Sequence, residues 1–211
     1  MKKILLTMIT VAGIGLVTNA QTFGFQKGDV LLEGAVNVSS SDNKNTENRV
    51  SSFALTPKAG YFVSDKFAVG VQFTYSESKN TNYSGTNDTY NKTNTIGGAI
   101  FGRYYFLEAG SRFKVYGEAD LGYNSAGGEN NNGTTTVKFD NTNSFGANAG
   151  VGANFFLTEK IAIGYQFADI IGYNSSKMDV DGAKASNNFY VNLNSFGNFF
   201  NTGEFSLTFK L

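Results

Sequence analysis

The sequence contains no cysteine, no histidine and no tryptophan, and only one proline. The lack of cysteine excludes disulfide bonds, thiolate nucleophiles and iron–sulfur clusters. The lack of histidine excludes every imidazole acid, base or zinc ligand. Neither charge is in excess, because 17 Lys and Arg face 17 Asp and Glu. There is therefore no basic footprint for nucleic acid, and we expect no nucleic-acid partner.

The first twenty residues have the pattern of an export signal. Lys2 and Lys3 precede a mostly apolar run over residues 4–17, and Thr18-Asn19-Ala20 places small residues before Gln21. The run is too short for a typical transmembrane helix, and the order of charged, apolar and small residues is that of a secretory signal peptide. We therefore expect residues 1–20 to be removed after Ala20, leaving residues 21–211 as one exported domain.

The remaining chain alternates between apolar and polar or small residues with a period of two. Such alternation is the pattern of half-buried β-strands. It predicts eight strands, over residues 32–38, 52–61, 67–75, 96–106, 112–123, 145–155, 161–167 and 205–211. Half of these patterns extend over about 10 to 12 residues, beyond the usual length in soluble sheets and sufficient to cross a bilayer.

The connections between the strands differ systematically in length. Tight turns are predicted at residues 63–66, 107–111 and 157–160, whereas the other connections are long and polar, at 40–49, 76–93, 125–141 and 174 to about 202. Short turns at one end and long loops at the other are typical of transmembrane β-barrels. Eight is also the smallest strand number among such barrels.

Aromatic residues suggest which face of the strands meets lipid. We call the alternate strand positions that carry apolar residues the apolar parity. Its aromatic residues include Tyr61, Tyr104, Phe106 and Phe155 beside the short turns, and Tyr75 and Tyr123 at the opposite strand ends. Two aromatic bands around an apolar zone are typical of the girdles at membrane interfaces. We therefore expect the apolar parity to face lipid. A secreted, soluble carrier barrel with its apolar residues inside is the alternative.

The opposite parity should then fill the lumen. It carries a polar set that consists of Glu33, Lys58, Gln72, Arg103, Lys114, Glu118, Asp120 and Gln166. An eight-stranded barrel is only wide enough to be filled by side chains, and buried charges must be paired. We expect a structural plug of ion pairs in which Arg103 contacts Glu118 or Asp120. A narrow gated ion path through rearranged pairs is the alternative.

Two segments fit the strand pattern less well. Pro57 falls inside a predicted strand, where it forfeits a ladder hydrogen bond, so we expect it at a bulge or near the rim. The last connection contains an apolar stretch over residues 189–200. We expect this stretch to pack over the barrel mouth, with a continuation of the eighth strand or an adhesive patch as alternatives.

The chain also repeats a hairpin. Residues 61–73 align without gaps to residues 155–167, and both copies fit F-[VL]-[ST]-[DE]-K-[FI]-A-[VI]-G-x-Q-F. With the signal peptide and the eight alternating strands, this hairpin resembles the small outer-membrane β-barrel proteins of the OmpA/OmpX-like superfamily. The amino-acid sequence of the hairpin is most similar to versions from Bacteroidetes. The resemblance covers essentially residues 21–211.

The resemblance implies an all-β, eight-stranded antiparallel up-and-down transmembrane β-barrel in the cell outer membrane. Short turns would be periplasmic and long loops extracellular. It also implies insertion by the barrel-assembly machinery, contact with outer-membrane lipid and a monomeric state. The family usually ends in an aromatic residue, whereas here Lys210 and Leu211 follow Phe209.

Catalysis is not expected. The enzymatic outer-membrane barrels resemble one another in relying on histidine, and no catalytic, cofactor or metal-binding pattern stands out here. Asp179-Val180-Asp181-Gly182 lacks the remaining ligands of a calcium loop, so a plain turn is expected. The expected role is structural or surface-interacting, with porin-like passage of ions or small solutes and adhesion through extracellular loops as alternatives.

Overall fold

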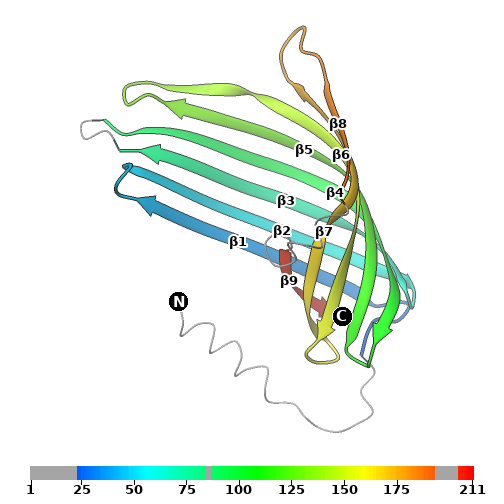
Figure 1. The fold of residues 1–211 in the computed structure, drawn as a ribbon. Helices are drawn as coiled ribbons and strands as arrows, with labels where there is room; N and C mark the ends of the chain where they lie inside the picture. Colours follow the sequence, from blue (N-terminus) through cyan, green and yellow to red (C-terminus); the bar gives the residue numbers. More distant parts are fainter. Residues whose placement is uncertain (1–22, 84–86, 193–203) are drawn as a thin grey trace.

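The computed structural model describes residues 23–83, 87–192 and 204–211. Its regular structure consists of long antiparallel strands (Figure 1). Their bounds are β1 Val30–Asn43, β2 Asn48–Ser64, β3 Phe67–Asn82, β4 Thr89–Ala109, β5 Phe113–Asn131, β6 Thr136–Phe156, β7 Ile161–Met178, β8 Ser186–Val191 and β9 Glu204–Lys210. The predicted signal peptide at residues 1–20 lies outside the described residues.

The strands form one sheet that closes on itself. The order is β6-β5-β4-β3-β2-β1-β9-β7-β8, and β6 also pairs with β7. On its other edge, β7 pairs with β9 through Ile161–Gln166 and with β8 through Ile171–Ser176. Because β8 and β9 follow one another along the same edge, they share the eighth position. The predicted eight-stranded antiparallel barrel is confirmed.

The closure between the first and last strands is short. Leu31 to Gly34 of β1 pair with Lys210 to Leu207 of β9. Above this junction, within the described residues, β1 pairs with β2 only. At the end opposite the β2–β3, β4–β5 and β6–β7 turns, Figure 1 shows β7 and β8 rising away from the sheet that β1 to β6 form. We call the end with the β2–β3, β4–β5 and β6–β7 turns the short-turn end, and the opposite end the far end.

The polar segments predicted as long loops are mostly strand. At the far end, residues 44–47, 83–88, 132–135 and 179–185 separate β1 from β2, β3 from β4, β5 from β6 and β7 from β8, and residues 193–203 lie outside the described residues. Asn, Ser and Thr favour turns, but here they continue the hairpin ladders and pair side by side. The Ser39 and Ser52 hydroxyls lie 2.6 Å apart, and Asn48 Nδ2 donates to Asn80 Oδ1 at 2.6 Å. The hairpins therefore extend well beyond the apolar band.

Pro57 lies in neither of the expected places. It is opposite Gly34 in the middle of the β1–β2 ladder, and the β2–β3 register is the same on both sides of it. The expectation of a bulge or a rim position is therefore wrong. Pairing with β3 is interrupted between Leu55 and Lys58, because proline has no N–H to donate.

The apolar stretch at residues 189–200 is only partly described. Phe189, Tyr190 and Val191 belong to β8 and pair with β7, so this part of the stretch continues the eighth strand. These three residues lie in the barrel wall and not over the mouth. Residues 193–200 lie outside the described residues.

The two faces of the barrel are chemically distinct. Large apolar side chains such as Val71, Ile100 and Leu121 are exposed on the outer face. The buried residues include Arg103, Glu33 and Lys58, whose side chains meet inside the barrel. Among the described residues, there is no helix with the length and hydropathy needed to span a bilayer.

A segment before the first strand closes the short-turn end. Phe25 stacks on Phe62 with ring centroids 4.3 Å apart, and it also contacts Tyr105 and Phe156. Gly28 N donates to Phe62 O, and Phe62 N donates to Asp29 O, each at 2.9 Å. These contacts hold residues 23–29 across the base of the barrel. We call Phe25, Phe62, Tyr105, Tyr116 and Phe156 the aromatic floor.

Candidate functional site

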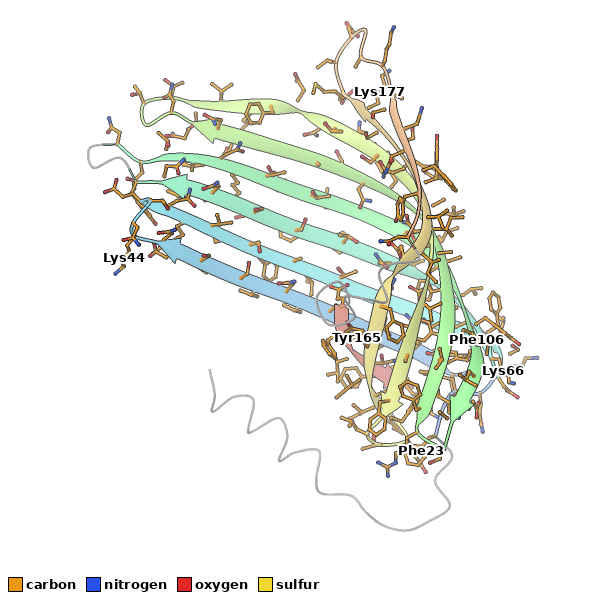
Figure 2. The ribbon with its side chains drawn as sticks, in the orientation of Figure 1. Phe23, Lys44, Lys66, Phe106, Tyr165 and Lys177 are labelled. Atoms are coloured by element: carbon orange, nitrogen blue, oxygen red, sulfur yellow. The ribbon has the colours of Figure 1, made fainter. Side chains whose placement is uncertain are left out.

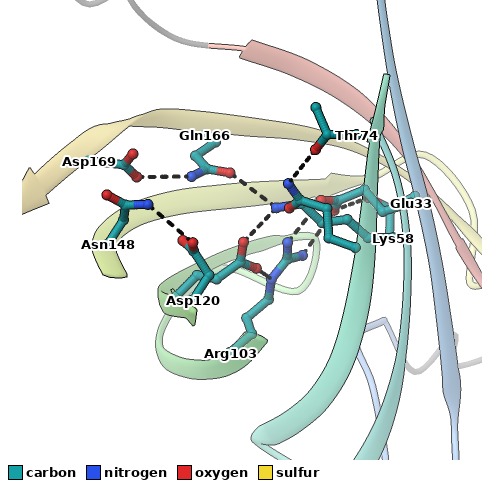
Figure 3. Close-up of polar contacts among 11 residues, drawn as sticks. Glu33, Lys58, Thr74, Arg103, Asp120, Asn148, Gln166 and Asp169 are labelled. Carbon is teal, nitrogen blue, oxygen red and sulfur yellow. Dashed lines mark hydrogen bonds and ion pairs between the residues drawn. The ribbon is translucent and has the colours of Figure 1, made fainter. Parts of the chain in front are cut away.

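The candidate site lies in the lumen, where two pairs of opposite charge meet. Glu33 on β1 is the register partner of Lys58 on β2, and Arg103 on β4 is the register partner of Glu118 on β5. All four follow the inward parity of their strands. Directly opposite side chains of opposite charge stabilise a strand pair, and closure of the barrel brings these two pairs into one cluster (Figure 3).

Arg103 is the centre of this cluster. Its Nη1 and Nη2 donate to the two carboxylate oxygens of Glu33 at 2.9 and 2.8 Å, and its Nε donates to Glu118 Oε2 at 2.6 Å. Lys58 Nζ donates to the remaining oxygen of Glu118 at 2.5 Å. Thr208 Oγ1 donates to Glu33 Oε2 at 2.9 Å. We call Glu33, Lys58, Arg103 and Glu118 the ion-pair network.

The network is balanced in charge and buried. It contains two carboxylates and two cations, and the Arg103 residue is 0% exposed. The guanidinium also lies 3.9 Å from the centroid of the Tyr116 ring. Among the described residues, every buried side-chain nitrogen or oxygen has a hydrogen-bond partner. A buried charge cluster persists only when its charges are paired and its remaining donors are satisfied.

A chain of hydrogen bonds connects the network to the aromatic floor. Asn154 Nδ2 donates to Thr208 Oγ1 at 3.1 Å, and Tyr105 OH donates to Asn154 Oδ1 at 2.6 Å. Tyr105 in turn packs on Tyr116 with ring centroids 5.4 Å apart. A polar layer and an apolar layer are thus joined directly, and both cross the lumen.

A polar cavity lies on the far-end side of the network. Its volume is about 500 Å³, and Lys58 and Gln166 line it beside the network. The carboxylates of Asp120, Asp169 and Glu204 also line it. Among them, Asp120 accepts a hydrogen bond from Asn148 Nδ2 at 3.2 Å. The cavity is more acidic than the network, because Lys58 is the one cation among its described lining residues and already contacts Glu118.

The structure brings half of the predicted lumen set into the network. The predicted Arg103–Glu118 pair is present, and Asp120, the other partner considered, bonds to Asn148 instead. Gln166 accepts a bond from Lys58 Nζ at 3.4 Å, so it borders the network. Gln72 Nε2 donates to Thr74 Oγ1 at 3.2 Å, and both residues line the polar cavity. Lys114 lies apart from this group, in an ion pair with Glu108 at 2.7 Å.

Several lumen residues were missed by the sequence analysis. Asn154 and Thr208 stand on the inward parity, so the alternation could have identified them. Phe25 precedes the first strand, where no alternation marks it. Asp169 on β7 was missed because the pairing of β7 with β6 contains two register shifts. On the β6 side they lie between Ala149 and Gly150 and between Val151 and Gly152. Each shift changes the parity, so simple counting along β7 fails.

The predicted girdle residues lie on the outer face. Tyr61, Tyr104, Phe106 and Phe155 are 45% to 52% exposed near the short-turn end. Tyr123 is 54% exposed toward the far end, where Tyr75 is half-buried beside Phe53 at 6.3 Å between ring centroids. Figure 2 shows Phe106 projecting from the outer wall. The girdle role of these residues stays a prediction.

The arrangement offers little for catalysis or metal binding. Within residues 23–83, 87–192 and 204–211, no group of three or more Asp and Glu side chains is placed to hold a metal ion. The carboxylates of the network are committed to Arg103 and Lys58. What the site can do chemically is hold charge in a fixed, paired state.

Long antiparallel strands, an apolar exterior and a charged interior define an outer-membrane-type β-barrel. The chain matches the family described as outer membrane protein beta-barrel domain over residues 8–199. It therefore belongs to that family, and no correspondence with Bacteroidetes in particular is shown. No curated protein matches the chain.

Several solved outer-membrane barrels are similar to the chain at low identity. The outer membrane protein OprG from Pseudomonas aeruginosa is 14% identical, with 89% of this chain and 98% of that chain covered and a TM-score of 0.49. Neisserial surface protein A is 19% identical, with coverages of 87% and 96% and a TM-score of 0.36. Ail, the attachment invasion locus protein of Yersinia pestis, is 12% identical, with coverages of 88% and 100% and a TM-score of 0.39.

Proposed function

We propose that this protein is a non-conducting outer-membrane barrel with a structural or surface-interacting role. The observation that carries the proposal is the ion-pair network, whose four charges cross the lumen and satisfy one another. Moving an ion past Arg103 would require breaking its contacts with Glu33 and Glu118, which is costly in a dry interior.

The aromatic floor adds a second barrier. Phe62, Tyr116 and Phe156 are 0% or 1% exposed, so water has little access at this level. An ion that passed the network would still meet an apolar layer. Two barriers of different chemistry in series suit a scaffold better than a pore.

The far end suits a surface role. β4 and β6 each contain 21 residues, about twice the 9–11 that a tilted strand needs to cross a bilayer. The excess forms paired hairpins rather than loose loops, so the outer surface is a firm sheet rich in Asn, Ser and Thr. A rigid polar surface of this kind is a platform for contacts with other molecules.

The remaining expectations belong to the same proposal. The barrel is monomeric, lies in outer-membrane lipid and is inserted by the barrel-assembly machinery after a signal peptide is removed following Ala20. It has no catalytic activity and no cofactor.

Planar-bilayer recording tests the proposal. Purified, folded protein should give no conductance steps under conditions in which a known porin, added to the same bilayer, opens. Regular steps of one size from the folded protein would overturn the proposal. Folding is checked in the same sample by a heat-dependent change in gel mobility.

Passage of ions or small solutes remains the second candidate, because the polar cavity of about 500 Å³ reaches the network. This candidate requires the Lys58 and Arg103 pairs to rearrange. Steps in the unaltered protein that change size in Lys58→Gln would favour it. Silence in both proteins favours the scaffold.

The surface role has its own test. Replacing the far-end tips at residues 44–47 and 132–135 by short glycine-containing turns should leave the barrel folded. Loss of binding to cells or matrix with folding retained supports a surface role. Unchanged binding would count against a role for these tips.

A further inference from the structure

Past the apolar band, the hairpin extensions of β1 to β4 carry their charges on the outer face. There Arg49 pairs with Asp42 at 3.0 Å, and Lys92 pairs with Glu77 at 2.9 Å. Lys79 is the register partner of Lys92 and shares this face. Among the described residues of these strands, the inward positions between the ion-pair network and the far-end tips carry no charged side chain. The two faces of the extensions therefore differ in charge.

The inner face of the extensions carries small, uncharged side chains that form hydrogen bonds. A row of hydroxyl groups crosses the four strands in register and consists of Ser39, Ser52, Ser78 and Thr93. Two positions nearer the tips, Asn80 lies opposite Asn91. We call these residues the hydroxyl–amide face. The 2.6 Å contact between the first two hydroxyls of the row shows that neighbouring side chains point the same way.

The hydroxyl–amide face is open to solvent. The side chains of Ser39, Ser78 and Thr93 are exposed, and so are those of Asn80 and Asn91. Beyond its short pairing with β9, β1 pairs with β2 alone within the part of the chain that the structure describes. Figure 1 shows β7 and β8 turned away from the sheet of β1 to β6 at this end. A chain molecule can therefore reach this face from outside the barrel.

The spacing of the hydroxyl row suits a chain of sugars. Neighbouring strands lie about 4.8 Å apart, which is close to the length of one sugar unit in an extended, β-linked glycan. A glycan that crosses the strands thus meets one protein hydroxyl at each sugar. Hydroxyl and amide groups both donate and accept hydrogen bonds, as sugar hydroxyls do. The side chains are short and held on a paired sheet, so binding requires little ordering of the protein.

The sorting of charge indicates that the partner is uncharged. Water reaches both faces of an exposed hairpin, so solvation alone gives no reason to keep charges off one of them. A charged side chain beneath a bound neutral molecule would lose its water without compensation. An anionic partner would lose its own water on this face without meeting a cation, because Arg49, Lys79 and Lys92 lie on the other side.

We propose that the hydroxyl–amide face binds an uncharged, extended glycan that lies across β1 to β4. The far end is extracellular in such barrels, so the glycan is one that the cell meets at its surface. This inference rests on the surface role proposed above and names the chemistry of its partner. It does not depend on whether the lumen conducts.

Calorimetric titration of the full, folded barrel tests the partner. The detergent must have no sugar headgroup, because such a headgroup would compete. Mannohexaose with β-linkages is the neutral, extended probe, and an oligomannuronate of the same linkage and length is its charged counterpart. Maltohexaose is neutral but coiled. Mannohexaose should bind about tenfold more tightly than either of the others. Equal binding of the three probes, or preferred binding of the oligomannuronate or of maltohexaose, overturns the proposal.

Variants locate the binding face. Ser78→Leu removes a hydroxyl from the middle of the row and lifts the glycan from its neighbours, so mannohexaose affinity should fall about tenfold. Ser40→Leu is the matched control, because Ser40 is an exposed serine on the outer parity of β1 and its substitution should leave affinity unchanged. Heat-dependent gel mobility verifies that both variants fold. Equal mannohexaose affinity of the two variants would refute the site.

A milder pair of variants isolates the hydrogen bond from the bulk of the side chain. Thr93→Val removes one hydroxyl of the row at nearly constant volume and should weaken mannohexaose binding about fivefold. Thr81→Val, on the outer parity of β3, should not weaken it. Unchanged affinity in Thr93→Val would count against the hydroxyl row as the contact.

The glycan inference and the surface role can fail separately. If mannohexaose does not bind, but replacing the tips at residues 44–47 and 132–135 still abolishes binding to cells or matrix, the glycan inference is wrong and the surface role stands. If mannohexaose does not bind and the tip replacements also have no effect, both are wrong.

Discussion

Arg103 shows how a single residue can organise the lumen. It makes three charge-assisted hydrogen bonds, stacks on Tyr116 and is completely buried. Its partners Glu33 and Glu118 come from strands on different sides of the barrel. One side chain therefore ties β1, β4 and β5 together across the lumen, in addition to the backbone ladders between neighbours.

Replacing Arg103 should destabilise the barrel strongly. Arg103→Met leaves the Glu33 carboxylate buried without its main partner, and loss of one member of a buried pair costs about 3–5 kcal/mol. Urea unfolding in detergent micelles or vesicles measures the change. Arg49→Met is the control, because the Arg49–Asp42 ion pair is exposed to solvent and should contribute little to stability. Equal stability of the two variants would contradict the central position of Arg103.

Gly152 makes room for the aromatic side of the network. A Cβ at this position would lie 2.4 Å from the Tyr116 ring. Gly152→Ala should therefore displace Tyr116 from beneath Arg103 and lower stability by about 1–3 kcal/mol. Gly34→Ala is the matched control, because nothing lies within 4 Å of a Cβ at Gly34. If the Gly152→Ala and Gly34→Ala barrels unfold at the same urea concentration, the Tyr116 side chain can move aside without a loss of stability.

The segment before β1 acts as a structural element although it forms no strand. Phe25 enters the base of the barrel, and Lys210 Nζ donates to the Gly24 carbonyl at 2.9 Å. The segment thus joins the two ends of the described barrel chain. Its packing is the apolar counterpart of the ion-pair network above it.

Removing Phe25 should weaken this element. Phe25→Ala leaves a cavity among Phe62, Tyr105 and Phe156, and large-to-small changes of this kind cost about 3–5 kcal/mol. Phe106→Ala, on the exposed outer face, serves as the comparison and should change unfolding in urea much less. If both variants unfold alike, the segment contributes no stability to the floor.

The alternation predicted much of the architecture at this scale, for a physical reason. A strand with one lipid-facing and one lumen-facing side must alternate, so the eight positions, the inward charges and a contact of Arg103 with Glu118 or Asp120 could be predicted. The entry of Phe25 into the floor could not, because residues 23–29 have no period. Asp169 could not, because the irregular pairing of β7 changes its parity. Asn-, Ser- and Thr-rich hairpin extensions have the composition of loops, so pairing at the far end was also missed.

At the scale of the whole molecule, the proposed function treats the two layers that cross the lumen as barriers in series. In that proposal the ion-pair network resists ions by charge pairing, and the aromatic floor resists them by excluding water. The resistances of two barriers in series add, so opening one layer leaves ion passage blocked by the other. This distinguishes a doubly closed barrel from a pore with a single gate.

Conductance should therefore appear only when both layers are opened. A network variant with Glu33→Gln, Lys58→Gln, Arg103→Gln and Glu118→Gln removes the charges without leaving one unpaired, and it should remain silent in planar bilayers. A floor variant with Phe25→Ser should also remain silent. The combined variant should give steps, provided that heat-dependent gel mobility shows it folded. Steps from the network variant alone would mean that the floor is permeable, and steps from the floor variant alone would mean that the network already lets ions pass.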